Sequence, residues 1–324
     1  MFHIIFKIKN VSCHFSVAII LAMLLVVCAG YSPAQAAAKG VQQKTYASPE
    51  EAVKALVEAM KSDDAKALIA ILGPGSKQVI SSGDDVADKT FYEKFVKAYE
   101  DKNKIEMIND SKAILSVGEK DWPLPIPIVK KGQKWFFDTK SAKEEILNRR
   151  IGRNELSTVK FCEAFVDAQM EFALKDNDGD GLFEYAEKFW SDPGKKNGLY
   201  WETKEGEEPS PLGPLAAEAA KAGYGKQKSS DQPRPYHGYY FRILKAQGKN
   251  APGGAYDYVV KDSMIGGFAL VAYPAQYGNS GVMTFIVNQA GVVYQKNLGK
   301  DTAKLAQTIK LFDPDKTWKK VESE

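Results

Sequence analysis

The densest group of chemically useful side chains is an acidic loop, residues 176–187, which follows the longest helical pattern of the chain. Acidic residues stand at positions 1, 3, 5 and 12 of this loop and a glycine at position 6, as in an EF-hand calcium loop. Carboxylates at alternate positions of a tight loop converge on one centre, and calcium requires several oxygen ligands. The pattern predicts a structural calcium ion bound by Asp176, Asp178, Asp180, the carbonyl of Leu182, and Glu187.

Two features of the acidic loop differ from a complete EF-hand. Pro193 cuts short the exit helix that we expect over residues 184–190, and the chain contains no second hand. The alternative interpretation is a turn rich in Asn, Asp and Gly that joins two helices without an ion.

Catalytic groups are scarce. The chain has 3 histidines, and only His237 lies outside the first thirty-six residues. Cys162 falls on the apolar stripe of a helix, so we expect it in the core. Ser280 stands in Gly-Asn-Ser-Gly, which is not the Gly-x-Ser-x-Gly spacing of a nucleophile elbow. These observations favour a non-enzymatic protein; the alternative is an extracytoplasmic hydrolase that uses His237 or a cavity in the N-terminal domain.

Three arginines in a short run form a second charged motif. They could bind an anion, or they could pair with neighbouring glutamates in a charged junction, which is the interpretation we favour. The arginines are Arg149, Arg150 and Arg153, and the glutamates are Glu144, Glu145 and Glu155.

The first residues have the pattern of a secretory signal peptide. Lys7 and Lys9 precede an apolar run over 17–27, and small residues precede a cleavage site after Ala36. The apolar run is too short for a transmembrane helix. We therefore expect a periplasmic or secreted protein without a transmembrane segment in its mature chain. In the alternative, Cys28 becomes a lipid-anchored N-terminus, although Val27 is not the small residue usual before such a cysteine.

Composition excludes some classes of protein. The 324 residues are 44% hydrophobic and 26% charged, which suits a globular protein of two domains. Cleavage after Ala36 removes two of the 3 cysteines, so no intrachain disulfide remains. It also removes two lysines and no acid, which lowers the formal charge from +3 to +1. A nearly neutral protein lacks the positive charge that attracts nucleic acid, so nothing in the composition indicates nucleic-acid binding. We expect the partner to be an envelope protein or a small ligand.

The order of predicted elements indicates an α+β protein with a signal peptide at 1–36 and a linker at 37–45. Residues 46–148 show helices and then antiparallel strands, the element order of nuclear transport factor 2-like folds. Residues 149–324 show a long helix, the acidic loop and a second antiparallel sheet. Near the boundary we expect two separate helices, over 141–150 and over 154–175.

Several motifs resemble one known family. They are residues 122–127, 149–155, 178–181, 210–215, 235–240 and 280–285. With these motifs the chain resembles the secreted bacterial family called domain of unknown function 2950. The resemblance covers nearly all of the mature chain and implies a bacterial envelope protein, but it supplies no reaction and no catalytic residues. The second half is also similar, more loosely, to pseudopilin globular domains, which combine a long helix, an acidic turn and a small antiparallel sheet.

Overall fold

The computed structural model describes residues 42–177, 179, 181–224 and 234–322. The predicted signal peptide, the alternative lipid anchor at Cys28 and the first part of the predicted linker lie outside these residues, as do Asp178 and Asp180 of the acidic loop. The described residues all belong to one compact unit, Val41–Glu324. Within this unit the buried hydrophobic side chains form two separate clusters.

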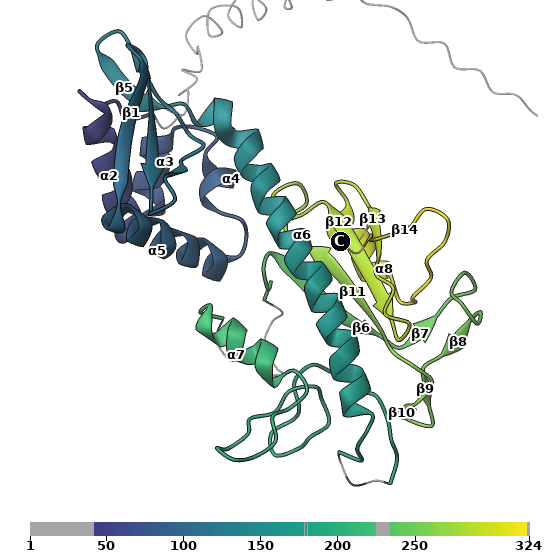
Figure 1. The fold of residues 1–324 in the computed structure, drawn as a ribbon. Helices are drawn as coiled ribbons and strands as arrows, with labels where there is room; N and C mark the ends of the chain where they lie inside the picture. Colours follow the sequence, from purple (N-terminus) through teal and green to yellow (C-terminus); the bar gives the residue numbers. More distant parts are fainter. Residues whose placement is uncertain (1–41, 178, 180, 225–233, 323–324) are drawn as a thin grey trace, which may run out of the picture. The chain divides into compact units, whose positions relative to one another are not determined.

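Four helices open the described chain (Figure 1). They are α2 (Pro49–Lys61), α3 (Ala65–Leu72), α4 (Lys77–Ile80) and α5 (Asp85–Asp101). Local sequence accounts for the start of two of them. The Ser48 hydroxyl accepts a hydrogen bond from the amide of Glu51, and the Asp64 carboxylate accepts from Lys66 and Ala67, which are N-cap contacts.

The helices pack on a first antiparallel sheet. Its strand order is β1-β2-β4-β5, and β3 also pairs with β2. The first hydrophobic cluster fills the space between this sheet and helices α2, α3 and α5. The strands are β1 (Asn103–Asn109), β2 (Lys112–Val117), β3 (Trp122–Pro123), β4 (Ile128–Lys131) and β5 (Lys134–Phe137).

A single long helix, α6 (Thr139–Phe172), runs where we predicted two, so the predicted break near residue 151 is wrong. Asp138 caps its start by accepting from the amide of Ser141. Gly152 lies inside the helix, where a glycine costs only about 1 kcal/mol relative to alanine. Tertiary packing offsets that cost, because α6 contacts both α4 and the second sheet.

The second sheet is antiparallel in the order β14-β13-β12-β11-β6, and α6 packs against β11 and β12 (Figure 1). Phe165 and Phe172 of α6 are buried in the second hydrophobic cluster together with Phe268 and Phe285. The strands are β6 (Tyr239–Leu244), β11 (Ala269–Pro274), β12 (Met283–Asn288), β13 (Tyr294–Asn297) and β14 (Lys319–Lys320).

Smaller elements complete this part of the chain. Two short pairs, β7 with β8 and β9 with β10, follow β6, and α8 packs on β11. Their bounds, with those of α7, are β7 (Ala246–Gln247), β8 (Tyr256–Asp257), β9 (Val259–Val260), β10 (Ser263–Met264), α7 (Gly213–Lys221) and α8 (Thr302–Thr308).

Residues 184–190 do not form the predicted helix; the segment is irregular. Its backbone groups bond to distant partners instead of to one another. The amide of Tyr185 donates to the carbonyl of Met264, and the buried Gln169 side chain both donates to and accepts from the backbone of Ala186. These contacts replace the local hydrogen bonds that a helix would provide.

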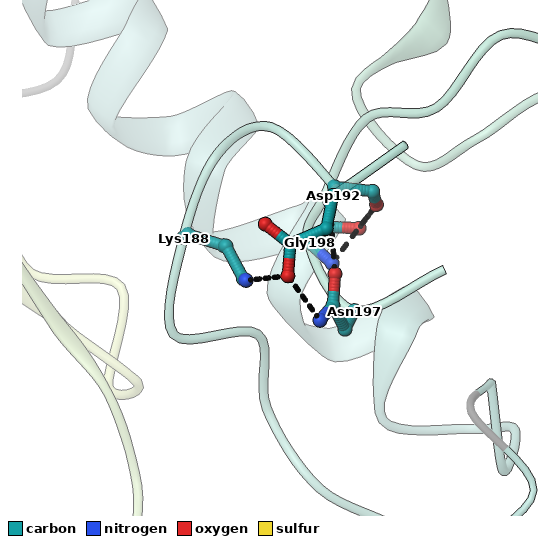
Figure 2. A network of polar contacts seen from close by, with 5 residues as sticks. Lys188, Asp192, Asn197 and Gly198 are labelled. Carbon is teal, nitrogen blue, oxygen red and sulfur yellow. Dashed lines mark hydrogen bonds and ion pairs between the residues drawn. The ribbon is translucent and has the colours of Figure 1, made fainter. Parts of the chain in front are cut away.

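A polar network then closes the turn over 188–198 (Figure 2). The Asp192 carboxylate accepts from Lys188 at 2.7 Å and from the Asn197 amide group at 3.0 Å, and the Asp192 amide donates to Asn197 Oδ1. Hydrogen bonds from Lys188 and Asn197 lower the pKa of Asp192. This network holds an exposed turn in one conformation without regular secondary structure.

The architecture confirms the predicted α+β fold: helices, an antiparallel sheet, a long helix and a second antiparallel sheet follow one another. None of the helices in the described ranges combines the length and the apolar character needed to cross a bilayer.

Candidate functional site

Polar residues from distant parts of the chain meet beside the middle of α6. We call this group the junction cluster and define it as Asp84, Arg150, Tyr224, His237 and Asn279. Asp84 is only 2% exposed. Its carboxylate accepts from the amide of Ala87, from the Tyr224 hydroxyl at 2.8 Å and from the amide of Gly238 at 2.9 Å. Three hydrogen-bond donors therefore stabilise the buried carboxylate of Asp84. Through these hydrogen bonds, Asp84 links the start of α5 to two segments of the C-terminal half.

Arg150 forms the other half of the cluster. Its guanidinium donates to the carbonyls of Gln78 and Val79 at the end of α4, and to Asn279 Oδ1 at 2.7 Å. Asn279 in turn donates to the carbonyl of Ser81 at 3.0 Å. Burial lowers the pKa of Arg150, and the nearby Asp88 charge opposes that shift. Arg150 thus ties α6 to the loop that leads into α5.

The next turn of α6 binds the loop before β12. The Asn154 side chain donates to the carbonyl of Ser280, and one Glu155 oxygen accepts from the amides of Val282 and Met283, each at 2.9 Å. Gly281 is required in this loop, because a Cβ there would lie 2.0 Å from the hydroxyl oxygen of Tyr239. Three motifs far apart in sequence, 149–155, 235–240 and 280–285, are therefore in contact.

His237 lies among aromatic rings at this junction. Its ring centroid is 4.3 Å from that of Tyr236 and 5.7 Å from that of Tyr224, and its amide donates to the Tyr224 hydroxyl. Its backbone has a φ of 49°, which is unusual for a residue other than glycine. Burial lowers the pKa of His237; the charge of Asp84 opposes this, while Arg153 and Lys94 add to it.

The other candidate nucleophiles are buried. Cys162 is fully buried in the second hydrophobic cluster, as predicted, and burial raises the pKa of its thiol. Ser280 is also fully buried, and its hydroxyl accepts from the amide of Gln276 and donates to the Gln276 carbonyl. Both side chains therefore have structural roles.

The predicted arginine junction is correct only in part. Arg149 pairs with Glu145 at 2.6 Å, as expected. Arg150 binds backbone carbonyls and an amide oxygen instead of a glutamate, and Glu155 binds backbone amides. Sequence reasoning missed Asp84 altogether. An N-cap signal was available, since Asp84 precedes α5 and accepts from Ala87, but its other donors are 140 and 154 residues away in sequence.

The acidic loop begins directly after α6. The Asn177 side chain donates to the carbonyl of Phe172 and so caps the helix end. The Asp176 carboxylate accepts from the amides of Gly179 at 2.7 Å and Gly181 at 3.0 Å. Gly181 has a φ of 86°, as expected for the sharp turn at this position.

The remaining predicted ligands stand further along the loop. Glu187 forms an ion pair with Lys245, which follows β6. Leu182 is 44% exposed and Phe183 is 65% exposed. Among the described residues, which exclude Asp178 and Asp180, no three His, Cys, Asp or Glu side chains are grouped closely enough to hold a metal. The calcium site therefore stays a prediction.

Two cavities lie elsewhere on the described chain. One, of about 410 Å³, lies beside α2 and α3 and is lined in part by Lys44, Glu58 and Lys61. The other, of about 390 Å³, lies at the end of α6 and is lined in part by Phe172 and Trp201. His237 lines neither of them.

Comparison with known proteins identifies a family. A family model described as "Protein of unknown function (DUF2950)" matches residues 43–321. No curated protein and no solved structure matches the chain. The similarity of the second half to pseudopilin globular domains therefore stays a prediction.

The two adjacent arginines provide a test of the junction cluster. Arg150→Met should lower the free energy of unfolding by about 3 kcal/mol, because it leaves the buried Asn279 side chain and the half-buried Val79 carbonyl without their donor. Arg149→Met removes an exposed ion pair and should cost less than about 0.5 kcal/mol. Urea unfolding followed by circular dichroism measures both values, and equal losses in the two variants would contradict the structural role of Arg150.

His237 should make stability depend on pH. Its pKa in the folded protein lies below the ordinary value of 6.5. The unfolded chain therefore takes up a proton before the folded chain does, and the free energy of unfolding falls as the pH drops below 6.5. The variant His237→Asn has no group at this position that titrates in this pH range. Asparagine is chosen because it tolerates the positive φ of residue 237. Urea unfolding from about pH 7.5 to 5 should show a flatter decline for this variant than for the wild type; parallel curves would overturn the assignment.

Proposed function

Because the chain belongs to the DUF2950 family of proteins of unknown function, we propose a role at the level of architecture: an exported bacterial envelope protein that acts as a non-enzymatic binding or structural module. Its acidic loop binds calcium, and the ion stabilises the end of α6. The partner is an envelope protein or a small ligand.

One observation carries the non-enzymatic part of this proposal: groups that could do chemistry are used to hold the chain together. Cys162 and Ser280 are fully buried, and Arg150 binds carbonyl oxygens. Asp84 is surrounded by donors from three segments. A nucleophile or base must reach a substrate, and these side chains do not. Of the two features that the hydrolase alternative named, His237 lines neither of the two cavities described above. A cavity of about 410 Å³ does lie in the N-terminal domain beside α2 and α3, lined in part by Lys44, Glu58 and Lys61.

The calcium proposal rests on spacing and on the local fold of the loop. The Asp176 carboxylate already accepts hydrogen bonds from the amides of Gly179 and Gly181. The segment after the loop is fixed by Gln169 through Ala186, directly before Glu187. An ion bound by Asp176 and Glu187 would replace the ammonium of Lys245 as the partner of Glu187. A single loop of this kind is expected to bind weakly, with a dissociation constant on the order of 0.1–1 mM.

Calcium should raise the melting temperature. At about 10 mM calcium, a site of this affinity adds roughly 1.4–2.7 kcal/mol of stability, or about 3 °C or more. The melting temperature is measured in calcium and in chelator for the wild type and for two ligand variants, Asp176→Asn and Glu187→Gln. The control is Glu93→Gln, which alters an exposed carboxylate of α5. Only the first two variants should lose the shift.

A fourth variant sharpens the calcium test. Lys245→Met removes the cation that competes for Glu187 and should tighten calcium binding several-fold in a calorimetric titration. An unchanged melting temperature of the wild type in calcium, or an equal shift in Asp176→Asn, would refute the site.

Export is tested by the mass of the mature protein. The full chain is expressed in a bacterium, the cell fractions are separated, and the intact mass of the protein in each fraction is measured by mass spectrometry. We expect a released protein that begins at residue 37, and Cys28→Ser should change nothing. A membrane-bound product that begins at an acylated Cys28, and that Cys28→Ser abolishes, would establish the lipid-anchored alternative. An uncleaved chain in the cytoplasm would refute export.

A further inference from the structure

The cavity at the end of α6 combines an aromatic floor with a charged rim. The ring of Trp201 packs edge-on against Phe172, with the centroids 6.4 Å apart. Pro209 and Pro211 also line the cavity. A volume of about 390 Å³ lies in the range of small-ligand pockets. Because the Trp201 ring is only half-buried, part of its face remains available to a bound group.

Carboxylates outnumber cations around this cavity. Its lining includes Glu171, Glu207 and Glu208 against Lys175 and Lys196. Lys175 pairs with Glu208 at 2.5 Å, and this contact, with a smaller contribution from Lys196, lowers the pKa of Glu208. In the described part of the chain, neither Glu171 nor Glu207 takes part in an ion pair. The rim therefore has carboxylate charge that its own lysines do not pair.

An ammonium group of the protein itself already occupies the aromatic floor. Lys196 Nζ lies 5.5 Å from the centroid of the Trp201 ring, in a cation–π contact. Lys196 is exposed and directly precedes Asn197, which belongs to the Asp192 network (Figure 2). Glu207 accepts a hydrogen bond from the amide of Lys204 but, like Glu171, forms no ion pair within the described ranges. An indole face next to carboxylates of this kind recognises an alkylammonium group, and Lys196 shows that one fits.

We propose that this cavity binds an alkylammonium ligand, whose charged end replaces Lys196 on the Trp201 ring and is balanced by Glu171 and Glu207. The ligand is a free diamine or a lysine side chain presented by a peptide. The inference rests on the proposed role as a binding module and gives that module a ligand class. It does not depend on calcium, since the cavity uses none of the five predicted calcium ligands.

Calorimetric titration of the full mature chain tests the proposal, with two probes added up to about 20 mM in the presence of saturating calcium. The probes are 1,5-diaminopentane, for the free diamine, and Nα-acetyl-lysine amide, for a lysine within a peptide. We expect saturable binding of at least one probe, and the stronger one identifies the source of the ammonium group. Glu207→Gln should weaken binding about three-fold or more.

Two adjacent lysines supply a matched control. Lys196→Met removes the internal competitor and should tighten binding at least about three-fold, whereas Lys195→Met makes the same charge change outside the cavity and should leave affinity within about two-fold. Trp201→Leu should abolish the gain seen in Lys196→Met. Absence of saturable binding, or equal effects of the two lysine variants, would overturn the inference. The calcium-dependent melting of the same samples would still be measured, so failure here is distinct from failure of the calcium site.

Discussion

A buried carboxylate must be surrounded by donors, and Asp84 imposes that requirement on the folded chain. The donors are the first turn of α5, the hydroxyl of Tyr224 and the amide of Gly238. No one of these segments could satisfy the charge alone. Once it is satisfied, the start of α5 is fixed against two stretches of the C-terminal half. Arg150 acts in the same way from α6, through the carbonyls of Gln78 and Val79.

This constraint explains how the polar family motifs are used. Asn154 and Glu155 bind the loop that contains Ser280, and Gly281 lets Tyr239 approach that loop. Each of these residues meets the hydrogen-bonding needs of another segment, so together they specify one arrangement of α6 and the second sheet. The polar side chains of these motifs are therefore used in hydrogen bonds within the fold.

The groups for which we propose ligand binding lie at the C-terminal end of α6. Asp176 and Asn177 follow its last turn, and the cavity lined by Trp201 adjoins the same end. The turn over 188–198, which is closed by Asp192 and Asn197, places Lys196 above the indole ring. The junction cluster contacts α6 near its middle, and two charged features lie at the C-terminal end of the helix. We propose binding roles for both.

The sequence alone determined what depends on near neighbours. Ser48 and Asp64 cap helices through amides two or three residues away, and apolar patterning predicted both antiparallel sheets and the core position of Cys162. The tertiary structure decided the rest. Because α6 packs against both α4 and the second sheet, the helix continues through Gly152. Glu187 forms an ion pair with Lys245, 58 residues away in sequence, and does not lie in an exit helix. Two donors to Asp84, Tyr224 and Gly238, are even more distant in sequence. A buried carboxylate needs donors, but they can come from any segment that the fold places beside it, so local residue spacing does not predict them.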